Sequence, residues 1–449
     1  MTLEGKRALV LGLGKSGLAA VHFLVARGAI VAAADARVRN QLAAAAASLE
    51  RLPVCLHFGG HPDSLLAEQD LIVPSPGVPW DLPGLVRARQ RGVAVCGELE
   101  LAADALRGRV IGVTGTNGKT TTVSLIDHVL RRAGVSGKLA GNVGTPVLEI
   151  ADGSRCEDWH VLELSSFQLE ACSSFRCHVA AVLNVTPDHL DRHSDFAQYA
   201  AAKARILRNQ RSGDSAVLNA DDPHCRALEP AARGAVVRFG VQCAEDVDAC
   251  AAEGRIRYRG QDITDTDLPI KGDHNLENAL AAVAACALAG ISVGVIGQAL
   301  KSFQPVEHRM EFVATICGVD YYNDSKATNV AAAVKACGSF PRGLWAIVGG
   351  QDKGSDYAPL AAVLRRKARA ALLIGEAAPL IRADLGGNVP VVEAGTLRAA
   401  IDYAADQAKP GDTVLLAPAC ASFDQYQNYI QRGCDFREIV AGLGGGACR

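Results

Sequence analysis

Short apolar runs alternate along the chain with longer segments whose hydrophobic residues recur at helical spacing, and glycine-containing turns separate the two. The apolar runs have the length and β-branched content of buried strands. The predicted strands are residues 7–11, 30–34, 70–73, 110–113, 160–164, 179–185, 216–220, 344–348, 370–374 and 412–417. Because strands that alternate with helices form βαβ units, the pattern predicts an α/β fold with mainly parallel sheets. Such sheets bind ligands at the carboxyl ends of their strands, so the glycine-rich strand ends are the places to look for function.

Two predicted boundaries divide the chain of 449 residues. One lies near Gly97, before a new strand–loop–helix unit, and the other lies near Pro305, where a long uncharged helical stretch ends. The predicted domains are residues 1–97, 98–305 and 306–449, each within the usual size of a domain.

The first predicted strand leads into GLGKSG at residues 12–17, and Asp35 follows the second strand. A GxGxxG loop with an acidic residue about 20 positions later is typical of dinucleotide sites, where a helix N-terminus receives the pyrophosphate. The loop requires only a diphosphate and a ribose, so a nucleotide-sugar diphosphate would satisfy it as well as a nicotinamide or flavin cofactor. A tight turn without a ligand is a third interpretation. The PSPG turn at residues 74–77 would complete the pocket.

The second predicted domain opens with a phosphate-binding loop. Residues 114–122 read TGTNGKTTT, after a predicted strand and before a helix. A Gly-Lys-Thr core supplies backbone N–H groups for phosphates, an ammonium for the β and γ oxygens, and a hydroxyl for Mg²⁺. Val113 stands where the generic motif has glycine, which indicates a specialised variant. The chain has only 12 lysines against 34 arginines, so a lysine inside a motif carries extra weight.

Carboxylates and imidazoles follow the next predicted strands. Glu163 ends a strand in VLELSSFQ, and Asp188 and His189 follow another in NVTPDHLDRH. In a P-loop protein, a carboxylate at a neighbouring strand end suits Mg²⁺, and a histidine after a parallel strand suits a second metal. Alternatively, Asp188 and His189 form a helix N-cap and His193 is an exposed side chain. Lys203 lies on an alanine-rich helix, where a lysine is normally solvated.

Polar motifs follow strands in the third predicted domain as well. They are EHRME at residues 307–311, YNDSKATN at 322–329, GGQDKG at 349–354 and PACASFDQY at 418–426. Because the last three each follow a strand, we expect them to gather at one edge of a sheet. Two lysines, an arginine and several hydroxyls there would suit a substrate with carboxylates.

Composition narrows the functional classes. With 46 Lys+Arg against 48 Asp+Glu, the formal charge is −2, which argues against nonspecific electrostatic binding to nucleic acid or anionic lipid. The 14 cysteines show neither CxxC pairs nor zinc spacing, so we expect buried, reduced thiols in a cytoplasmic protein. Residues 278–300 carry no charge, but glycines interrupt them, which predicts two short soluble helices and no membrane insertion.

The combined motifs resemble the Mur ligase family of peptidoglycan synthesis over nearly the whole chain. The residues that carry the resemblance are TGTNGKTTT, LELSSFQLE, NVTPDHLDRH, YAAAKARI, GDHNLENALAA and EHRMEF. The motifs NDSKATN, GGQDKG and PACASFDQYQNYIQRG resemble the D-glutamate-adding branch. The resemblance implies a Rossmann-like N-terminal domain, a P-loop ATPase-like central domain and a Rossmann-like C-terminal domain. It also implies ATP-dependent addition of D-glutamate to UDP-N-acetylmuramoyl-L-alanine through an acyl phosphate, with two Mg²⁺ ions.

The resemblance further implies a role for individual residues. ATP is assigned to Gly115, Thr116, Asn117, Gly118, Lys119, Thr120, Thr121, Asn275, Asn278, Arg309 and Asp324. The UDP substrate is assigned to Gly14, Lys15, Ser16, Asp35, Arg37, Ser75, Gly77, Asn142, Ser165, Gln168 and His189. D-Glutamate is assigned to Lys326, Thr328, Lys353, Ser422 and Phe423. The metals are assigned to Thr120, Glu163, His189 and a carbamylated Lys203, and catalysis to Lys119, His189, Lys203 and Lys326. A monomer is expected.

Three other functions stay open on the sequence. Another Mur or folylpolyglutamate-type ligase would share the phosphate loop but carry other residues around Asp324. An NAD-dependent dehydrogenase would explain GxGxxG and leave the phosphate loop without a role. A nucleotide-driven switch would explain the phosphate loop without a substrate, and its ATPase activity would not respond to any amino acid.

Overall fold

The computed structural model describes residues 2–61, 63–189, 192–270, 272–304, 307–340, 342–387 and 389–443. The chain divides into two compact units. Unit 1 comprises Met1–Val185, Ala197–Asp265 and Asn278–Leu300, and unit 2 comprises Thr186–Phe196, Thr266–Glu277 and Lys301–Arg449. The described residues form three separate β-sheets, two in unit 1 and one in unit 2.

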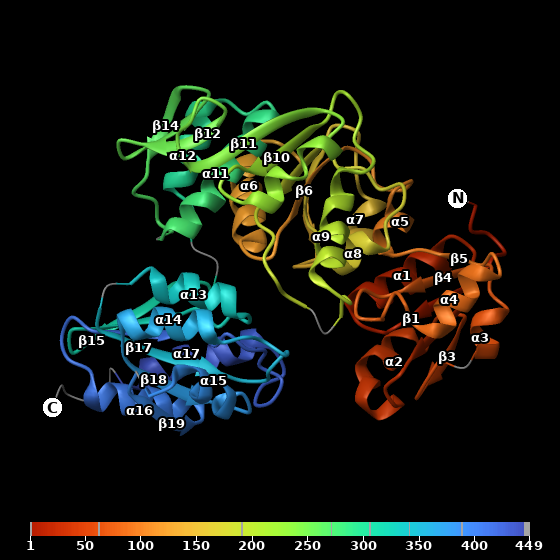
Figure 1. The fold of residues 1–449 in the computed structure, drawn as a ribbon. Helices are drawn as coiled ribbons and strands as arrows, with labels where there is room; N and C mark the ends of the chain where they lie inside the picture. Colours follow the sequence, from red (N-terminus) through yellow and green to blue (C-terminus); the bar gives the residue numbers. More distant parts are fainter. Residues whose placement is uncertain are drawn as a thin grey trace. The chain divides into compact units, whose positions relative to one another are not determined.

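The first sheet of unit 1 is parallel throughout and has the order β3-β2-β1-β4-β5 (Figure 1). Its strands are β1 (Arg7–Leu11), β2 (Ile30–Asp35), β3 (Val54–Phe58), β4 (Leu71–Pro74) and β5 (Ala94–Val95). Its helices are α1 (Lys15–Ala26), α2 (Ala43–Leu49), α3 (Asp63–Ala67), α4 (Pro83–Gln90) and α5 (Glu98–Ala102), with the 3₁₀ turn η1 (Arg39–Leu42). The strand order reverses between β1 and β4, which makes this edge a ligand-binding crevice. The predicted Rossmann-like domain is confirmed.

The second sheet of unit 1 has the order β14-β13-β12-β11-β10-β9-β6-β8-β7 and is parallel from β7 to β12. Its strands are β6 (Arg109–Thr114), β7 (Leu139–Gly141), β8 (Trp159–Glu163), β9 (Val179–Val182), β10 (Ser215–Asn219), β11 (Ala235–Gln242), β12 (Ala249–Ala252), β13 (Arg255–Tyr258) and β14 (Gln261–Asp265). The helices of this region are α6 (Lys119–Arg132), α7 (Val147–Ala151), α8 (Ser166–Glu170), α9 (Phe196–Ala204), α10 (Pro223–Arg226), α11 (Asp273–Leu288) and α12 (Val293–Lys301), with the 3₁₀ turns η2 (Arg205–Leu207) and η3 (Glu229–Ala231).

The uncharged stretch at residues 278–300 falls in α11 and α12, as predicted. Across the described part of the chain, none of the helices has both the length and the apolar character needed to span a bilayer.

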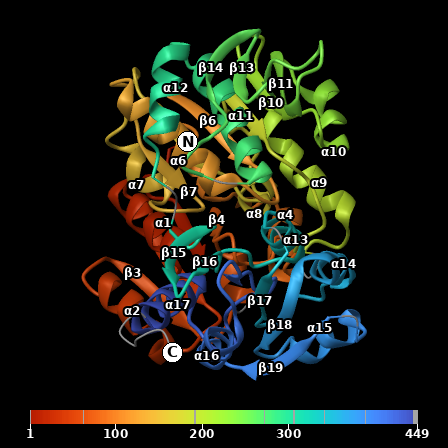
Figure 2. The ribbon, with the colours of Figure 1, turned by 90° about the vertical axis from the view of Figure 1, so that its left-hand side faces the viewer.

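The sheet of unit 2 has the order β15-β16-β20-β17-β18-β19, with only β15 antiparallel to its neighbour, and β17, β18 and β19 lie side by side in Figure 2. Its strands are β15 (Glu311–Ile316), β16 (Val319–Asn323), β17 (Leu344–Gly349), β18 (Ala368–Ile374), β19 (Val391–Gly395) and β20 (Thr413–Leu416). Its helices are α13 (Val330–Gly338), α14 (Ala358–Lys367), α15 (Ala378–Leu385), α16 (Leu397–Gln407) and α17 (Tyr429–Leu443).

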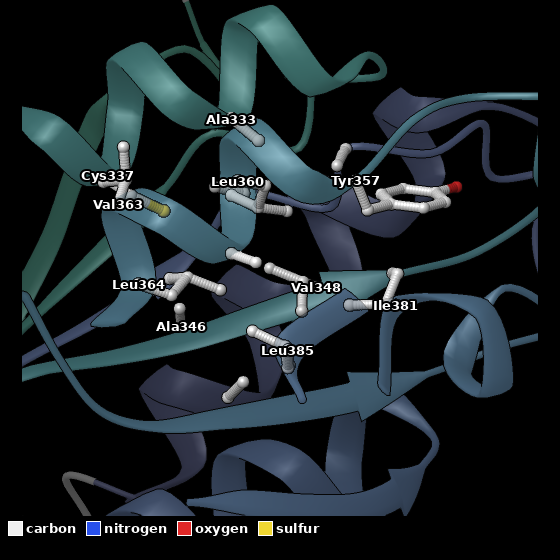
Figure 3. Packing of buried hydrophobic residues seen from close by; sticks show 14 of the residues in the cluster. Ala333, Cys337, Ala346, Val348, Tyr357, Leu360, Val363, Leu364, Ile381 and Leu385 are labelled. Carbon is white, nitrogen blue, oxygen red and sulfur yellow. The ribbon is translucent and has the colours of Figure 1, made fainter. Parts of the chain in front are cut away.

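Helices cover both faces of this sheet. Alternate residues of β17 enter two different cores, because successive side chains of a strand point to opposite faces. Ala346 and Val348 pack with α13, α14 and α15 (Figure 3), whereas Trp345 and Ile347 pack with α16 and α17. The predicted C-terminal Rossmann-like domain is therefore confirmed.

All ten predicted strands are present, with ends shifted by at most three residues. The strands that the pattern did not predict lie mostly toward the sheet edges and include β13, β14 and β15. β13 alternates half-buried and buried residues, and most residues of β14 and β15 are half-buried or exposed, so these strands lack the continuous apolar run of a buried parallel strand. The predicted boundary at residue 97 falls between β5 and β6. The second boundary, Pro305, lies outside the described residues.

The cysteine prediction is wrong at Cys243, Cys250 and Cys317, each of which is disulfide-bonded. Cys243 and Cys250 form a disulfide, because the parallel neighbours β11 and β12 are joined by a short connection that places the two Cα atoms 5.0 Å apart. The free cysteines that are buried are Cys96, Cys172, Cys177, Cys225, Cys286, Cys337 and Cys420, whereas Cys55 and Cys156 are exposed.

Candidate active site

The GLGKSG loop opens on a cavity of about 640 Å³ in unit 1. Its lining includes the predicted UDP-substrate residues Gly14, Lys15, Ser16, Asp35, Arg37, Ser75, Gly77, Asn142 and Gln168. Ser165 is not part of the lining, but its N–H donates to Gln168 Oε1 at 3.1 Å and its hydroxyl caps α8. Ser165 therefore orients a lining residue. The remaining predicted residue, His189, belongs to unit 2.

Asp35 organises the floor of this cavity. Its carboxylate accepts hydrogen bonds from the N–H of Leu13 at 2.8 Å and from the N–H, Nε and Nη2 of Arg37 at 2.9, 3.0 and 2.9 Å. Burial acts to raise the pKa of Asp35, but the hydrogen bonds from Arg37 and Leu13 outweigh it and lower the pKa to about 2. The carboxylate thus holds Arg37 toward the cavity. His61 also lines the cavity and was not predicted from the sequence. Its Nδ1 is buried and makes no hydrogen bond in the described structure.

The phosphate loop follows β6, the strand that lies between β9 and β8 in the second sheet. Gly118 caps α6 with φ +86°, and a Cβ there would lie 2.2 Å from Asn278 Oδ1, so the position requires glycine. Lys119 donates from Nζ to the carbonyl oxygens of Gly115 at 2.7 Å and Thr116 at 2.9 Å. The ammonium lies directly over the loop that it would serve.

A hydroxyl and a carboxylate meet beside this loop. Thr120 Oγ1 donates to Glu163 Oε2 at 2.6 Å, and Asn142 Nδ2 donates to Glu163 Oε1 at 2.9 Å. Glu163 is buried. Hydroxyl and carboxylate oxygens are the donors that Mg²⁺ prefers in P-loop proteins, so the pair fits one such ion. Among the residues that the structure describes, no group of three or more His, Cys, Asp or Glu side chains is arranged so that it could hold a metal ion.

Asn184 forms hydrogen bonds with the phosphate loop and was not predicted from the sequence as a site residue. Its carbonyl accepts from the N–H of Thr116 at 2.9 Å, and its side-chain Oδ1 accepts from the N–H of Asn117 at 2.8 Å. Asn184 Nδ2 donates back to the carbonyl of Asn117 at 3.2 Å. The available signal was its position at the start of NVTPDHLDRH, two residues after β9 ends.

Lys203 is buried, with 1% of its surface exposed, so the interpretation of a solvated helix face is wrong. Its Nζ donates to the carbonyl of Gly115 at 2.8 Å and lies 4.6 Å from the centre of the Tyr199 ring. The Tyr199 hydroxyl lies 3.0 Å from Thr116 Oγ1. The alanine-rich face of α9 therefore packs against the phosphate loop, and the lysine reaches that loop.

Several of the remaining predicted residues belong to unit 2. Asp188 accepts from the N–H of His189 at 2.9 Å and from Asn329 Nδ2 at 3.0 Å, while Asn329 also caps α13. His189 has φ +54°. Because Glu163 and Lys203 belong to unit 1, the predicted metal ligands are divided between the units.

The residues assigned to ATP are likewise divided. Asn278, in unit 1, accepts from Thr122 Oγ1 at 3.4 Å. Asn275, Arg309 and Asp324 are in unit 2, where Asp324 accepts from the N–H of Met310 at 3.3 Å. Burial raises the pKa of Asp324 to about 6, although Arg309 and Lys326 act to lower it. Arg309 Nε is buried without a hydrogen bond in the described structure.

Backbone hydrogen bonds join the three polar loops of unit 2, as the sequence predicts. The N–H of Gly349 donates to the carbonyl of Pro418 at 2.7 Å. Gln351 and Ala421 exchange N–H···O bonds of 2.9 and 3.1 Å. The N–H of Ala419 donates to the carbonyl of Ala327 at 2.9 Å.

The loops carry the residues assigned to D-glutamate. Lys326, Thr328 and Lys353 are half-buried and Ser422 is buried. Phe423, in contrast, is 66% exposed. Lys326 Nζ lies 5.3 Å from the centre of the Tyr429 ring, which the sequence argument had not singled out.

Family models match three segments of the chain. Residues 6–97 match the Mur ligase MurD-like N-terminal domain, residues 113–286 the Mur ligase middle domain, and residues 308–420 the Mur ligase glutamate ligase domain. The model of the middle domain covers the phosphate loop, Glu163 and Lys203.

Individual relatives agree with the family models. The chain is 50% identical over 444 residues to a UDP-N-acetylmuramoylalanine--D-glutamate ligase of Solibacter usitatus, with 99% of each chain covered. It is 47% identical over 454 residues to the protein of the same name in Acidobacterium capsulatum, covering 100% of this chain and 98% of the relative. A solved structure of MurF ligase from Thermotoga maritima in complex with ADP matches with a TM-score of 0.63 at 19% identity, covering 98% of this chain and 95% of the other, which shows a shared fold. The chain therefore belongs to the Mur ligase family, in the branch whose curated members are named UDP-N-acetylmuramoylalanine--D-glutamate ligases.

Proposed function

We propose that this protein joins D-glutamate to UDP-N-acetylmuramoyl-L-alanine at the expense of ATP, in the synthesis of a peptidoglycan precursor. One observation carries the proposal. Asn142 lines the 640 Å³ cavity and also donates to Glu163, which accepts from Thr120 of the phosphate loop. A cavity of this size suits a small organic ligand. A nucleotide-substrate site and a phosphate loop that share a side chain suit an enzyme that transfers a phosphoryl group between two ligands.

The chemistry requires activation because a carboxylate is a poor electrophile. A carboxylate oxygen of the alanyl substrate attacks the γ-phosphorus of ATP, the bond to the bridging oxygen breaks, and ADP leaves. The amine of D-glutamate then attacks the acyl carbon and loses a proton. The resulting tetrahedral intermediate expels inorganic phosphate and forms the amide.

Unit 1 supplies groups for the first step. Lys119 would neutralise charge on the transferring phosphoryl group, and such preorganised cations contribute several kcal/mol to phosphoryl transfer, on the order of 3–4. Thr120 and Glu163 would hold one Mg²⁺, which when bound offsets the charge of the phosphate oxygens. Arg37, Lys15 and Ser16 would bind the diphosphate and uridine portion in the cavity.

Unit 2 supplies groups for the second step. Asn275, Arg309 and Asp324 would contact the nucleotide, and His189 would serve a second metal and the substrate carboxylate. Lys326, Thr328, Lys353, Ser422 and Phe423 would bind D-glutamate.

We extend the proposal to a carbamate on Lys203. Carbamylation needs a neutral amine, which burial favours for a lysine and which an arginine does not supply. Lys203 is buried beside the phosphate loop, and its carbamate would be an anion able to join Glu163 at a metal.

The test of the carbamate is Lys203→Ala, assayed with and without short carboxylic acids that could take the place of the carbamate. Activity should fall and partly return with the added acid. Wild-type rates for Lys203→Ala or Lys203→Arg without added acid would refute the carbamate.

The function itself is tested by phosphate release from ATP with UDP-N-acetylmuramoyl-L-alanine and one amino acid at a time. Release should require both the UDP substrate and D-glutamate. Release that ignores the amino acid would favour a nucleotide switch, and a response to another amino acid alone would favour a different ligase. The proposal also covers a monomer acting in the cytoplasm, with domain boundaries at residues 97 and 305.

A further inference from the structure

One buried arginine contacts all three polar loops of unit 2. Arg432 lies on α17 and has 1% of its surface exposed. Its Nε donates to Ser325 Oγ at 3.0 Å and its Nη2 to the carbonyl of Ser325 at 2.9 Å. These bonds hold the loop that follows β16.

The same guanidinium also holds the loop after β20 and lies close to the loop after β17. Nη2 also donates to the carbonyl of Cys420 at 3.3 Å, and Nη1 donates to the carbonyl of Ala421 at 3.3 Å, in the loop after β20. A Cβ added to Gly350, in the loop after β17, would lie 3.2 Å from Nη1. Because β16, β20 and β17 are neighbours in the sheet, Arg432 lies where their three carboxyl ends meet.

Arg432 forms no ion pair with an acidic side chain in the described part of the chain, although the charge of Asp424 acts to raise the pKa of Arg432. Its hydrogen-bond acceptors are carbonyl and hydroxyl oxygens, and no carboxylate lies within 4.0 Å of it in the described part of the chain. Burial lowers the pKa of Arg432 to about 10, so the group stays protonated at neutral pH. Buried charges in proteins are normally paired, and an anionic ligand nearby would offset this one.

We propose that Arg432 is a positioning residue of the amino-acid site. It holds the loops that carry Lys326 and Ser422 in one arrangement beside the loop that carries Lys353, and its charge, which forms no ion pair, favours an amino acid with two carboxylates. The inference rests on the proposed function and deepens it, because Arg432 lies outside the set of residues assigned to D-glutamate.

Steady-state kinetics on the full-length chain test this role. Arg432→Lys keeps the charge but not the planar fork, and Arg432→Met removes both. We expect the KM for D-glutamate to rise about tenfold in Arg432→Lys and about a hundredfold or more in Arg432→Met. The KM values for ATP and for UDP-N-acetylmuramoyl-L-alanine should change by less than about threefold. Arg366→Met, at an exposed position on α14, is the control and should match the wild type.

A second variant covers the case in which Arg432→Met fails to fold. Ser325→Ala removes the acceptor of Arg432 Nε and leaves the charge in place. Its KM for D-glutamate should rise about threefold or more, with the other two KM values unchanged.

The outcomes separate the two proposals. A wild-type protein whose phosphate release ignores D-glutamate would overturn the proposed function, and this inference with it. If the wild type responds to D-glutamate but Arg432→Lys and Ser325→Ala keep its KM, only the inference fails. Equal changes in all three KM values would show a purely structural role and would overturn it too.

Discussion

Lys119 is half-buried and Lys203 is buried, and both lie against the phosphate loop. Lys119 and Lys203 come from different helices and both donate to the carbonyl of Gly115, at 2.7 and 2.8 Å. The two lysines lie more than 80 residues apart, so their spacing along the chain gave no reason to bring them to one atom, and only the family resemblance assigned both to catalysis. Two ammonium groups therefore meet at one carbonyl oxygen of the phosphate loop.

Lys119→Ala should abolish turnover while leaving the fold intact, because it removes the cation that faces the transferring phosphoryl group. Loss of one such charge typically lowers the rate by about a hundredfold to a thousandfold. Phosphate release measures the effect, and Lys138→Ala, at an exposed lysine of the same unit, is the control. Near-normal release by Lys119→Ala would contradict the role.

Asp324 makes the ligand-free protein sensitive to pH. Its folded-state pKa is raised from 3.8 to about 6, so the folded chain holds this proton more tightly than the unfolded chain does. Stability therefore falls as the pH rises from about 4 to 6, and the full deficit, up to about 3 kcal/mol, persists at higher pH.

Asp324→Asn should remove this deficit, making the ligand-free protein more stable than the wild type at pH about 7.5 and nearly equal to it at pH about 4. Denaturant unfolding at the two pH values measures the difference, with Asp402→Asn on the exposed side of α16 as the control. A stability change of the same size at both pH values would refute the buried-charge argument.

At the scale of elements, the first strand–helix turn depends on close packing. A Cβ on Gly17 would lie 1.9 Å from the carbonyl oxygen of Gly12 and 2.7 Å from Ser75 Oγ. That hydroxyl donates to the same carbonyl at 2.7 Å, so α1 packs directly against the turn that lines the cavity. The last glycine of the GxGxxG pattern is needed for helix–strand contact rather than for the ligand.

Gly17→Ala should destabilise the protein by about 1–3 kcal/mol or more, because no side chain can move aside to make room for the methyl group. Gly14→Ala is the matched control, since a Cβ there meets nothing within 4 Å and its φ is −77°. Thermal unfolding compares the two. Equal losses would show that the close approach is not the cause.

At the scale of the whole molecule, three sheets present loops at the carboxyl ends of their strands. The first lines the cavity, the second carries the phosphate loop and Glu163, and the third carries the loops that Arg432 joins. In the proposed function, the loops of all three sheets take part in binding the ligands.

The residues assigned to D-glutamate lie on loops of the third sheet. From them we expect the enzyme to select among amino acids. D-Glutamate should react in preference to L-glutamate and to D-alanine. With D-alanine, Lys353 and its neighbours would lose the partner for the side-chain carboxylate. Leaving such a cation unpaired costs on the order of 2–5 kcal/mol. Ratios of kcat/KM for the three amino acids measure it, and equal values for D-alanine and D-glutamate would remove the basis for the assignment.

The sequence by itself determined the α/β class, the ten central strands, the phosphate loop and the family. It could do so because these features are local: a buried parallel strand is a continuous apolar run, and a phosphate loop is a short contiguous motif. Edge strands such as β15, whose residues are half-buried or exposed, were missed because they lack such a run.

Only the tertiary structure decided which distant residues meet. It placed Lys203 against Gly115, Asn184 against the phosphate loop, and Asn142 between the cavity and Glu163. It also left Arg432 buried among three loops. Burial and hydrogen bonding at these positions depend on pairs that lie tens of residues apart or more, and the spacing of residues along one segment carries no information about such pairs.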